Sequence, residues 1–197
     1  MGDADEQLEQ AKEAEEAKGE NKKIALLIAV LALFLSFSET LGKSAQTEAV
    51  DANIKAADTW AFSQAKDIRR TTLMVAADQT ALLGAGVADA AAKAAIDKQL
   101  DTWHKTAARY ESDPSTGEGL KELREHAKEL ESERDLNLAR YHHYELASAA
   151  FQVGIVLASA AVITGIGLLA VCSGLLGVAG VAMMSFGVLT PLFLHLH

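Results

Sequence analysis

Histidine side chains near carboxylates are the residues of this chain whose types could support chemistry, and metal binding is the chemistry that they suggest. The chain has six histidines. Those in predicted helices, with the carboxylates near them, are His126, His142 and His143 with Glu122, Glu129 and Glu145, and His104 with Asp101. A helical di-metal site needs Glu-x-x-His pairs on facing helices, and the sequence has no such pair. We therefore predict no metal ligand and no cofactor, and we interpret Tyr141–Tyr144, His195 and His197 as interfacial residues.

Motifs for nucleophilic catalysis or nucleotide binding lack the partners that they need. Cys172 is the only cysteine, and it lies between apolar segments without a base or an orienting residue in sequence. Gly84-Ala85-Gly86 lacks the preceding strand and the further glycines of a phosphate-binding loop. The net charge of −9 and the dispersed basic residues argue against nucleic acid. We predict no catalytic residue. An enzyme with a helical metal site is therefore the least favoured of the three functional hypotheses, and the other two are given at the end of this section.

Glu39 and a set of small residues are the remaining candidates, and both would act in a membrane. Glu39 is the one acidic residue close to a hydrocarbon-length segment, where carboxylates often serve ion or proton paths; alternatively it reaches headgroups or Lys43. Small residues four apart allow close helix contact, within one chain or between chains. They are Gly154 and Ala158, Ala161 and Gly165, Ser173 and Gly177, and Gly180. Gly174, Gly177 and Gly180 could instead line a narrow pore.

Three apolar segments position these candidates. No Asp, Glu, Lys or Arg occurs from Leu146 to His197. Because a bilayer core needs roughly 20 apolar residues in a helix, residues 147–171 and 175–196 are predicted to span a membrane as a hairpin that turns at Cys172–Gly174. Residues 24–41 form a third predicted span, and a signal peptide is disfavoured because the preceding residues 1–23 are acidic. Residues 1–23 are predicted to be a frayed charged tail, with a solvated helix as the alternative.

The segment 42–146 lies between the first and second predicted spans and is predicted to be helical. A seven-residue repeat predicts a coiled-coil seam, with Ala57, Ala65 and Thr72 partly filling its second position. Its main positions are Ile54, Ala61, Ile68, Val75 and Leu82. Later runs begin at Ile96 and Leu120, separated by the turn cluster Asp113–Gly117. Since the chain must return to the membrane, we expect the second and third helices to lie end to end along the first. An alanine-rich seam buries little area, which favours oligomers.

Two stretches carry a resemblance to a known family. The run Ala25–Ala49 and the segment Trp60–Arg69 resemble the bacterial family called domain of unknown function 4337. The most specific part is Ser38–Thr47, and the similarity continues through Arg140–Tyr144 and the apolar hairpin, over nearly the whole chain. The resemblance implies a bacterial inner-membrane protein of about this length. It implies no activity and no site residues.

These patterns together predict an all-α membrane protein with three transmembrane helices and a long, coiled-coil-like helical stalk between the first and second. The first functional hypothesis is a non-enzymatic, homo-oligomeric scaffold or docking assembly. The alternative is an oligomeric channel or transporter-like pore lined by the C-terminal helices. The expected partners are the lipid bilayer, further copies of the chain and a protein on the stalk. The expected location is the bacterial inner membrane. Basic residues flank the spans on both faces, so they do not determine on which side of the membrane residues 42–146 lie.

Overall fold

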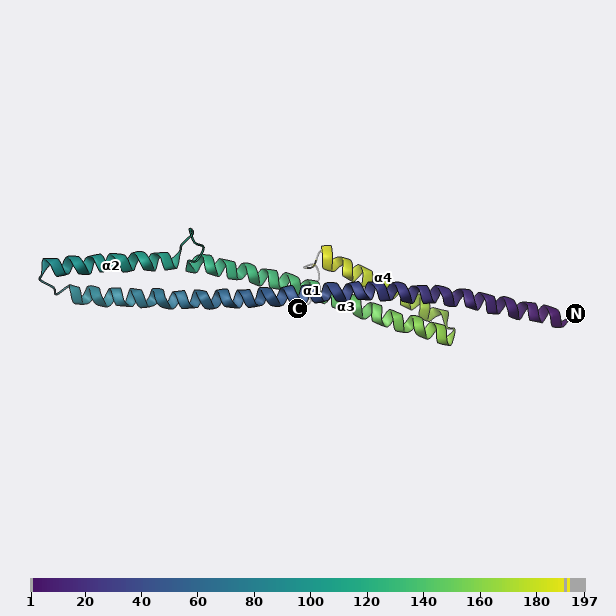
Figure 1. The fold of residues 1–197 in the computed structure, drawn as a ribbon. Coiled ribbons are helices and arrows are strands. Elements are labelled where there is room, and N and C mark those ends of the chain that lie inside the picture. The colour runs from purple at the N-terminus through teal and green to yellow at the C-terminus, as the bar shows by residue number, and fades with distance from the viewer. Residues whose placement is uncertain (1, 190, 192–197) are drawn as a thin grey trace. The chain divides into compact units, whose positions relative to one another are not determined.

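The computed structural model describes residues 2–189 and 191, with side chains from Gly19 onward. Its described part consists of four helices without a strand, which confirms the all-α prediction (Figure 1). The helices are α1 (Gly2–Gly84), α2 (Ala90–Glu111), α3 (Leu120–Thr164) and α4 (Gly167–Leu189). His195 and His197, and the end of the predicted span 175–196, lie outside the described residues.

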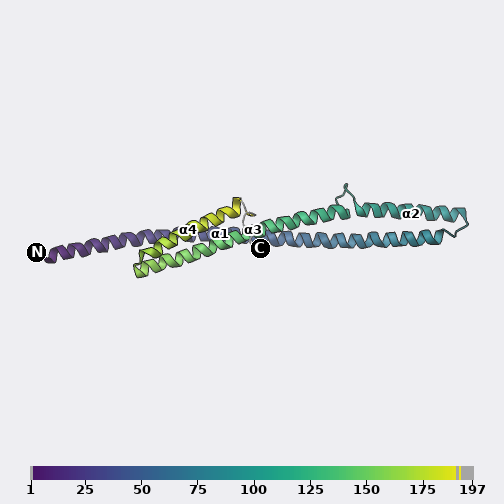
Figure 2. The ribbon, with the colours of Figure 1, turned by 180° about the vertical axis from the view of Figure 1, so that it is seen from behind.

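The chain forms two compact units, and α1 and α3 contribute to both. Unit 1 comprises residues 1–48 and 136–197, and unit 2 comprises residues 49–135. In unit 1, α4 lies beside α3 and the early part of α1, as both views show (Figure 1, Figure 2). In unit 2, α2 and the first part of α3 lie beside the later part of α1.

Helix α1 begins at Gly2, so the structure has the charged residues before the first apolar segment as helix, the alternative to a frayed tail. The alternative, a helix, fits the strong helix propensity of the Glu, Ala and Lys residues there. Helix growth is also easier than nucleation, and these residues adjoin an apolar helical segment that is already formed. The other end of α1, at Gly84, is where the sequence predicted a break.

The hairpin between α3 and α4 turns at residues 165–166, which corrects the predicted turn at Cys172–Gly174. Gly165 has a φ of 70°, and its N–H donates to the carbonyl of Ala161 at 2.9 Å. A left-handed glycine with this bond is a common helix C-terminus. The range 147–171 therefore contains this turn, and Cys172 lies inside α4. Thr164 is the one polar neighbour of Gly165, and a single threonine in an apolar segment does not mark a turn.

Three helical segments are long and apolar enough to cross a membrane. They are residues 19–84 of α1, α3 and α4, as judged by length and composition. In unit 1, Leu31 of α1 and Ala147 and Phe151 of α3 form a small core, against which partly buried residues of α4 pack. Phe34 stacks on Phe151 with ring centroids 5.9 Å apart. As predicted, α3 runs without interruption from the unit 2 contacts into this apolar core.

Unit 2 is an antiparallel arrangement in which α2 and α3 follow one another along α1. Side-chain contacts give the order. Passing down α1 from Gly84, the contacts are Gly84 with Ile96, Arg70 with Glu111, Lys66 with Glu118, Asp67 with Arg124, and Trp60 with Glu131. Apart from the neighbours Lys66 and Asp67, the partners' numbers rise as the α1 numbers fall. The end-to-end arrangement expected from the helix lengths is therefore present within this unit.

Candidate functional site

The histidines and carboxylates that suggested a metal do not converge. His126 Nδ1 lies 3.5 Å from Glu129 Oε2, and His142 Nδ1 lies 3.7 Å from Glu145 Oε2; both pairs are exposed and local to α3. Asp101 pairs with Lys105 at 2.6 Å. In the part of the chain that the structure describes, no three His, Cys, Asp or Glu side chains gather as metal ligands would.

His143 differs from the other described histidines because it is buried. Its Nε2 lies 3.1 Å from the carbonyl oxygen of Pro191, which can only accept, so Nε2 carries the hydrogen. Nδ1 has no hydrogen-bond partner among the described residues. A Cβ added at Gly187 would lie 3.1 Å from His143 Cβ, so His143 lies close beside the end of α4. The sequence interpretation of His143 as an interfacial ring missed this burial.

Small residues of the hairpin are used for packing within the chain. A Cβ at Gly177 would meet Leu31 Cδ2 at 2.7 Å, and one at Gly180 would meet Phe151 Cε1 at 2.6 Å. The buried Ser173 hydroxyl donates to the carbonyl of Gly154 at 2.7 Å. Close approach and an interhelical hydrogen bond are the contacts that small residues provide between apolar helices. Gly174, by contrast, faces open space.

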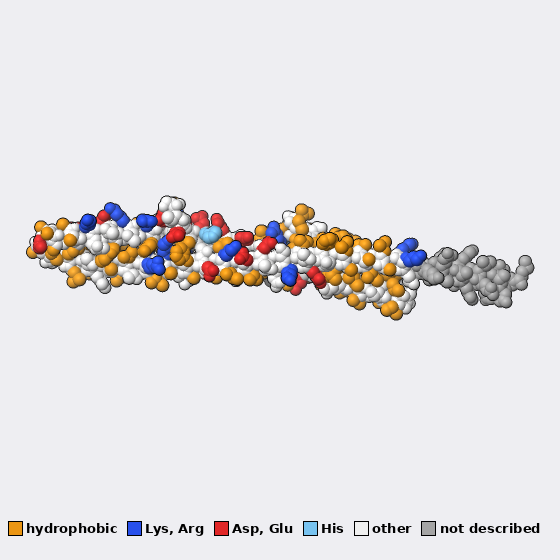
Figure 3. Space-filling model, in the orientation of Figure 1, with side chains coloured by type: hydrophobic (Ala, Val, Ile, Leu, Met, Phe, Trp, Pro, Cys, Tyr) orange, Lys and Arg blue, Asp and Glu red, His pale blue; other side chains and the backbone are white. Residues whose placement is uncertain are grey.

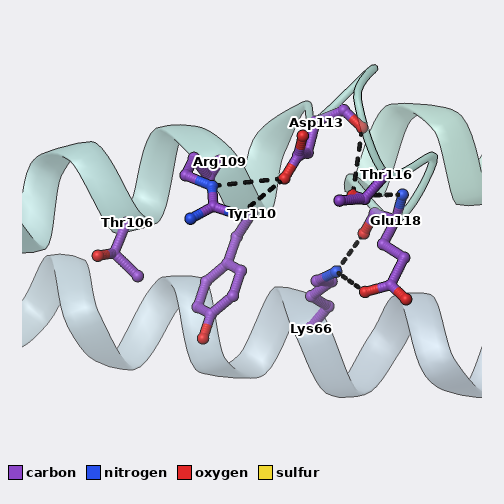
Figure 4. Close-up of a pocket in the computed structure, with 7 residues that line it drawn as sticks. All are labelled: Lys66, Thr106, Arg109, Tyr110, Asp113, Thr116 and Glu118. Atoms are coloured by element: carbon purple, nitrogen blue, oxygen red, sulfur yellow. Dashed lines mark hydrogen bonds and ion pairs between the residues drawn. The ribbon is translucent and has the colours of Figure 1, made fainter.

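A pocket of about 240 Å³ lies where the α2–α3 loop meets α1 in unit 2 (Figure 4). Lys66 of α1 is nearly buried, and its ammonium donates to the carbonyl oxygen of Glu118. The Glu118 carboxylate lies 3.4 Å from the same nitrogen. The Phe62 and Tyr110 rings lie 5.2 and 5.8 Å from it, within cation–π range.

The loop beside this pocket is held by a dense set of polar contacts. Asp113 accepts from Ser115 Oγ at 2.5 Å and from Arg109 Nη2 at 3.1 Å. These bonds lower the pKa of Asp113 to about 2. Glu122, at the start of α3, reaches back to accept from Ser112 Oγ at 2.5 Å and from the Asp113 N–H at 3.2 Å. The Ser112 bond is the main cause of a lowered Glu122 pKa.

The charged side chains that line this pocket pair with one another and connect its walls. Two cations, Lys66 and Arg109, face two carboxylates, Glu118 and Asp113, in matched pairs. The arrangement fixes the loop, and through it the junction of α2 and α3, against α1. Sequence analysis missed Lys66, and the available signal was its place among the small residues that face α2 and α3.

Two faces of α1 in unit 2 carry different side chains. We call the buried positions that face α2 and α3 the inner seam: Ala49, Ala52, Ala56, Ser63, Lys66 and Ala77. We call the predicted seven-residue repeat the outer stripe: Ile54, Ala61, Ile68, Val75 and Leu82. The alanines of the inner seam are 1–3% exposed, whereas the four large residues of the outer stripe are 50–78% exposed.

The predicted seam is therefore on the wrong side for packing within the chain, which corrects its expected role in a two-helix stalk. Hydrophobic side chains appear between charged ones on the visible face of unit 2 (Figure 3). A helix that is apolar on opposite faces is typical of one that is covered on both. The chain's own α2 and α3 cover one face only.

A family model described as "Domain of unknown function (DUF4337)" matches residues 20–190. No curated protein and no solved structure matches the chain.

Proposed function

We propose the function of this chain from its own residues, because the chain belongs to the DUF4337 family, whose description names no activity. The protein is a non-enzymatic, membrane-anchored helical scaffold that assembles with copies of itself. Unit 1 inserts in the bacterial inner membrane as a multi-pass anchor, and unit 2 carries the assembly surface. Its contact between copies is a parallel coiled coil formed by the outer stripe.

One observation carries this proposal: large apolar residues recur every seven positions on the face of α1 that the chain leaves uncovered. From Ile54 to Leu82 the same heptad position recurs five times, with Ala61 as its one small residue. A seven-residue apolar repeat is complementary to another helix with the same repeat. A second copy has that repeat, and anchoring in one membrane would give both copies the same direction and a high effective concentration. Parallel pairing in register then places each stripe residue against its own counterpart.

Disulfide trapping in membranes tests the contact, since Cys172 is the only native cysteine. In a Cys172→Ser background, Ile68→Cys and Leu82→Cys should give a covalent dimer under mild oxidation. Leu83→Cys is the matched control, because Leu83 is 79% exposed and Leu82 is 78% exposed. Only Leu82 is on the stripe. Equal cross-linking of Leu82→Cys and Leu83→Cys, or none at either stripe position, would refute the proposed contact.

Membrane anchoring needs its own test. After lysis and an alkaline carbonate wash, the chain should stay with the inner-membrane fraction because three apolar segments hold it. Recovery in the wash supernatant would contradict the anchor and leave the cross-linking result to be interpreted separately.

A further inference from the structure

The first apolar segment of α1 has an exposed face that continues the spacing of the outer stripe. Counting back from Ile54 in steps of seven gives Thr47, Thr40, Leu33 and Leu26, all in unit 1. These four residues are exposed, Leu26 by 67% and Leu33 by 55%. Helix α1 is unbroken through both sets of positions, so one helix carries the repeat in both units.

Two small residues lie beside these leucines, at the second position of the repeat. Ala29 and Ser36 each follow a leucine by three residues, as Ala57 follows Ile54 in unit 2, and both are exposed. Lys43 occupies the next second position, where its long stem can carry the ammonium to the headgroups. Small side chains allow the backbones of two apolar helices to approach closely. We call the following residues the membrane stripe: Leu26, Ala29, Leu33, Ser36 and Thr40.

The hydroxyls of this segment lie on two different faces of α1. Ser38 is buried, and its hydroxyl donates to the carbonyl of Tyr144 of α3 at 2.8 Å. Ser36 and Thr40 belong to the exposed face. The Thr40 hydroxyl donates to the carbonyl of Ser36 at 2.8 Å, which leaves the Thr40 oxygen able to accept. The Ser36 hydroxyl has no hydrogen-bond partner among the described residues.

A second helix suits these exposed hydroxyls better than lipid does. Acyl chains have no hydrogen-bonding groups, so a hydroxyl that faces them bonds its own backbone or stays unsatisfied. Between apolar helices, serine and threonine hydroxyls bond across the contact. Ser36 and Thr40 are four residues apart, about one helical turn, so a parallel neighbour would bring an acceptor close to each donor.

We propose that the membrane stripe is a second self-association surface, which packs against the membrane stripe of another copy of the chain. The Ser36 hydroxyl of each copy donates to the Thr40 oxygen of the other. Copies joined in parallel along the outer stripe have the same repeat in the first apolar segment, and the chain itself leaves that face uncovered. Forming either contact then holds the other at high effective concentration. The inference rests on the proposed membrane anchoring and self-association.

Disulfide trapping in membranes tests this contact in the Cys172→Ser background. Leu33→Cys and Thr40→Cys should each give a covalent dimer with a lipid-soluble oxidant, because each residue lies beside its counterpart. Leu41→Cys is the matched control, since Leu41 is also exposed, by 39%, but is not part of the membrane stripe. Equal cross-linking of Thr40→Cys and Leu41→Cys would overturn the inference.

The cross-linking results separate this contact from the one in unit 2. Covalent dimers of Leu82→Cys, with none of Leu33→Cys or Thr40→Cys, would overturn the membrane contact and leave the proposed function standing. Dimers of Leu33→Cys and Thr40→Cys, with none of Leu82→Cys, would support the membrane contact and refute the outer stripe as a contact between copies.

Removing the two hydroxyls tests whether a helix or lipid faces them. Ser36→Ala with Thr40→Ala should raise the dissociation constant about fivefold, since hydrogen bonds between membrane helices contribute little each. Dilution of labelled full-length chain in detergent measures this constant. Ser185→Ala is the control and should leave it unchanged, because Ser185 of α4 is also exposed and donates to the Val181 carbonyl at 2.8 Å. An unchanged constant for the double variant would overturn the proposed hydrogen bonds between copies.

Discussion

The inner seam and the outer stripe of α1 are two faces of one helix with opposite composition. Apart from Lys66, the inner seam is built from small side chains, and α2 and α3 lie close against it. Apart from Ala61, the outer stripe is built from larger branched side chains that the chain leaves exposed. Small residues permit close backbones but bury little area each, whereas large residues bury more area and need a partner. The difference indicates that α1 packs within the chain by proximity and between chains by hydrophobic area.

The largest effect should come from removing the apolar area of the outer stripe. Ile68→Gln, Val75→Gln and Leu82→Gln together should weaken self-association about a thousandfold, since three partly buried large side chains contribute roughly 4 kcal/mol. Dilution of fluorescently labelled full-length chain in detergent measures the dissociation constant. Leu83→Gln is the control and should leave it unchanged. A triple variant that associates like the native chain would contradict the assignment of self-association to the outer stripe.

At the inner seam, a larger side chain should destabilise unit 2, because the buried positions have no room for added volume. Ala77→Leu puts three extra carbons at a position that is 1% exposed and should destabilise unit 2 by about 1–3 kcal/mol. Val75→Leu, two residues away on the outer stripe, should leave unit 2 stability nearly unchanged. Both tryptophans, Trp60 and Trp103, are in unit 2, so denaturant unfolding followed by tryptophan fluorescence reports on this unit. Equal effects of the two substitutions would contradict the assignment of faces.

Much of the fold could be predicted from the sequence. The break at Gly84, the turn cluster at Asp113–Gly117 and the uninterrupted α3 follow from local residue preferences. The predicted runs beginning at Ile96 and Leu120 also face α1 in the structure. The turn at Gly165 could not be located, because glycine is common in apolar helices and its one polar neighbour, Thr164, does not mark a turn by itself.

The face of α1 was predicted wrongly for a different reason. Apolar periodicity identifies a face that must be covered, but it does not say by what. Ile54 and Ile68 give a stronger periodic signal than Ala52 and Ala56, so the outer stripe was taken for the internal seam. The Lys66 pocket was missed for a related reason, since a lysine among alanines suggests a solvated face until the Glu118 carbonyl is placed beside it.

The stability contributed by a buried lysine of the inner seam can be compared with that of an exposed lysine elsewhere on α1. Lys66→Met keeps the aliphatic stem but removes the ammonium from the Glu118 carbonyl and carboxylate, so unit 2 should lose about 2 kcal/mol. Lys55→Met removes an exposed ion pair with Asp51 and should cost much less, because solvent screens such pairs. Tryptophan fluorescence during urea unfolding measures both. A Lys66→Met variant as stable as Lys55→Met would mean that the pocket does not fix the loop.

Acid should weaken the inner contact selectively, and this is the smallest effect. Asp113 has a folded pKa of about 2 against an ordinary value of 3.8, because Ser115 and Arg109 hydrogen-bond to its carboxylate. A lowered folded pKa adds stability that is fully present above 3.8 and is lost as the pH falls from 3.8 toward 2. Unfolding of unit 2 should therefore become easier across that interval, and Asp113→Asn should flatten this part of the profile. Glu122 titrates in the same direction, so the Asp113→Asn profile keeps a residual slope that Glu122→Gln removes. The dissociation constant of the native chain, measured by dilution at neutral pH and again at pH 3, should not change, because no carboxylate is part of the outer stripe. An identical acid profile for the native chain and Asp113→Asn would show that the loop contributes nothing to holding α2 and α3 on α1.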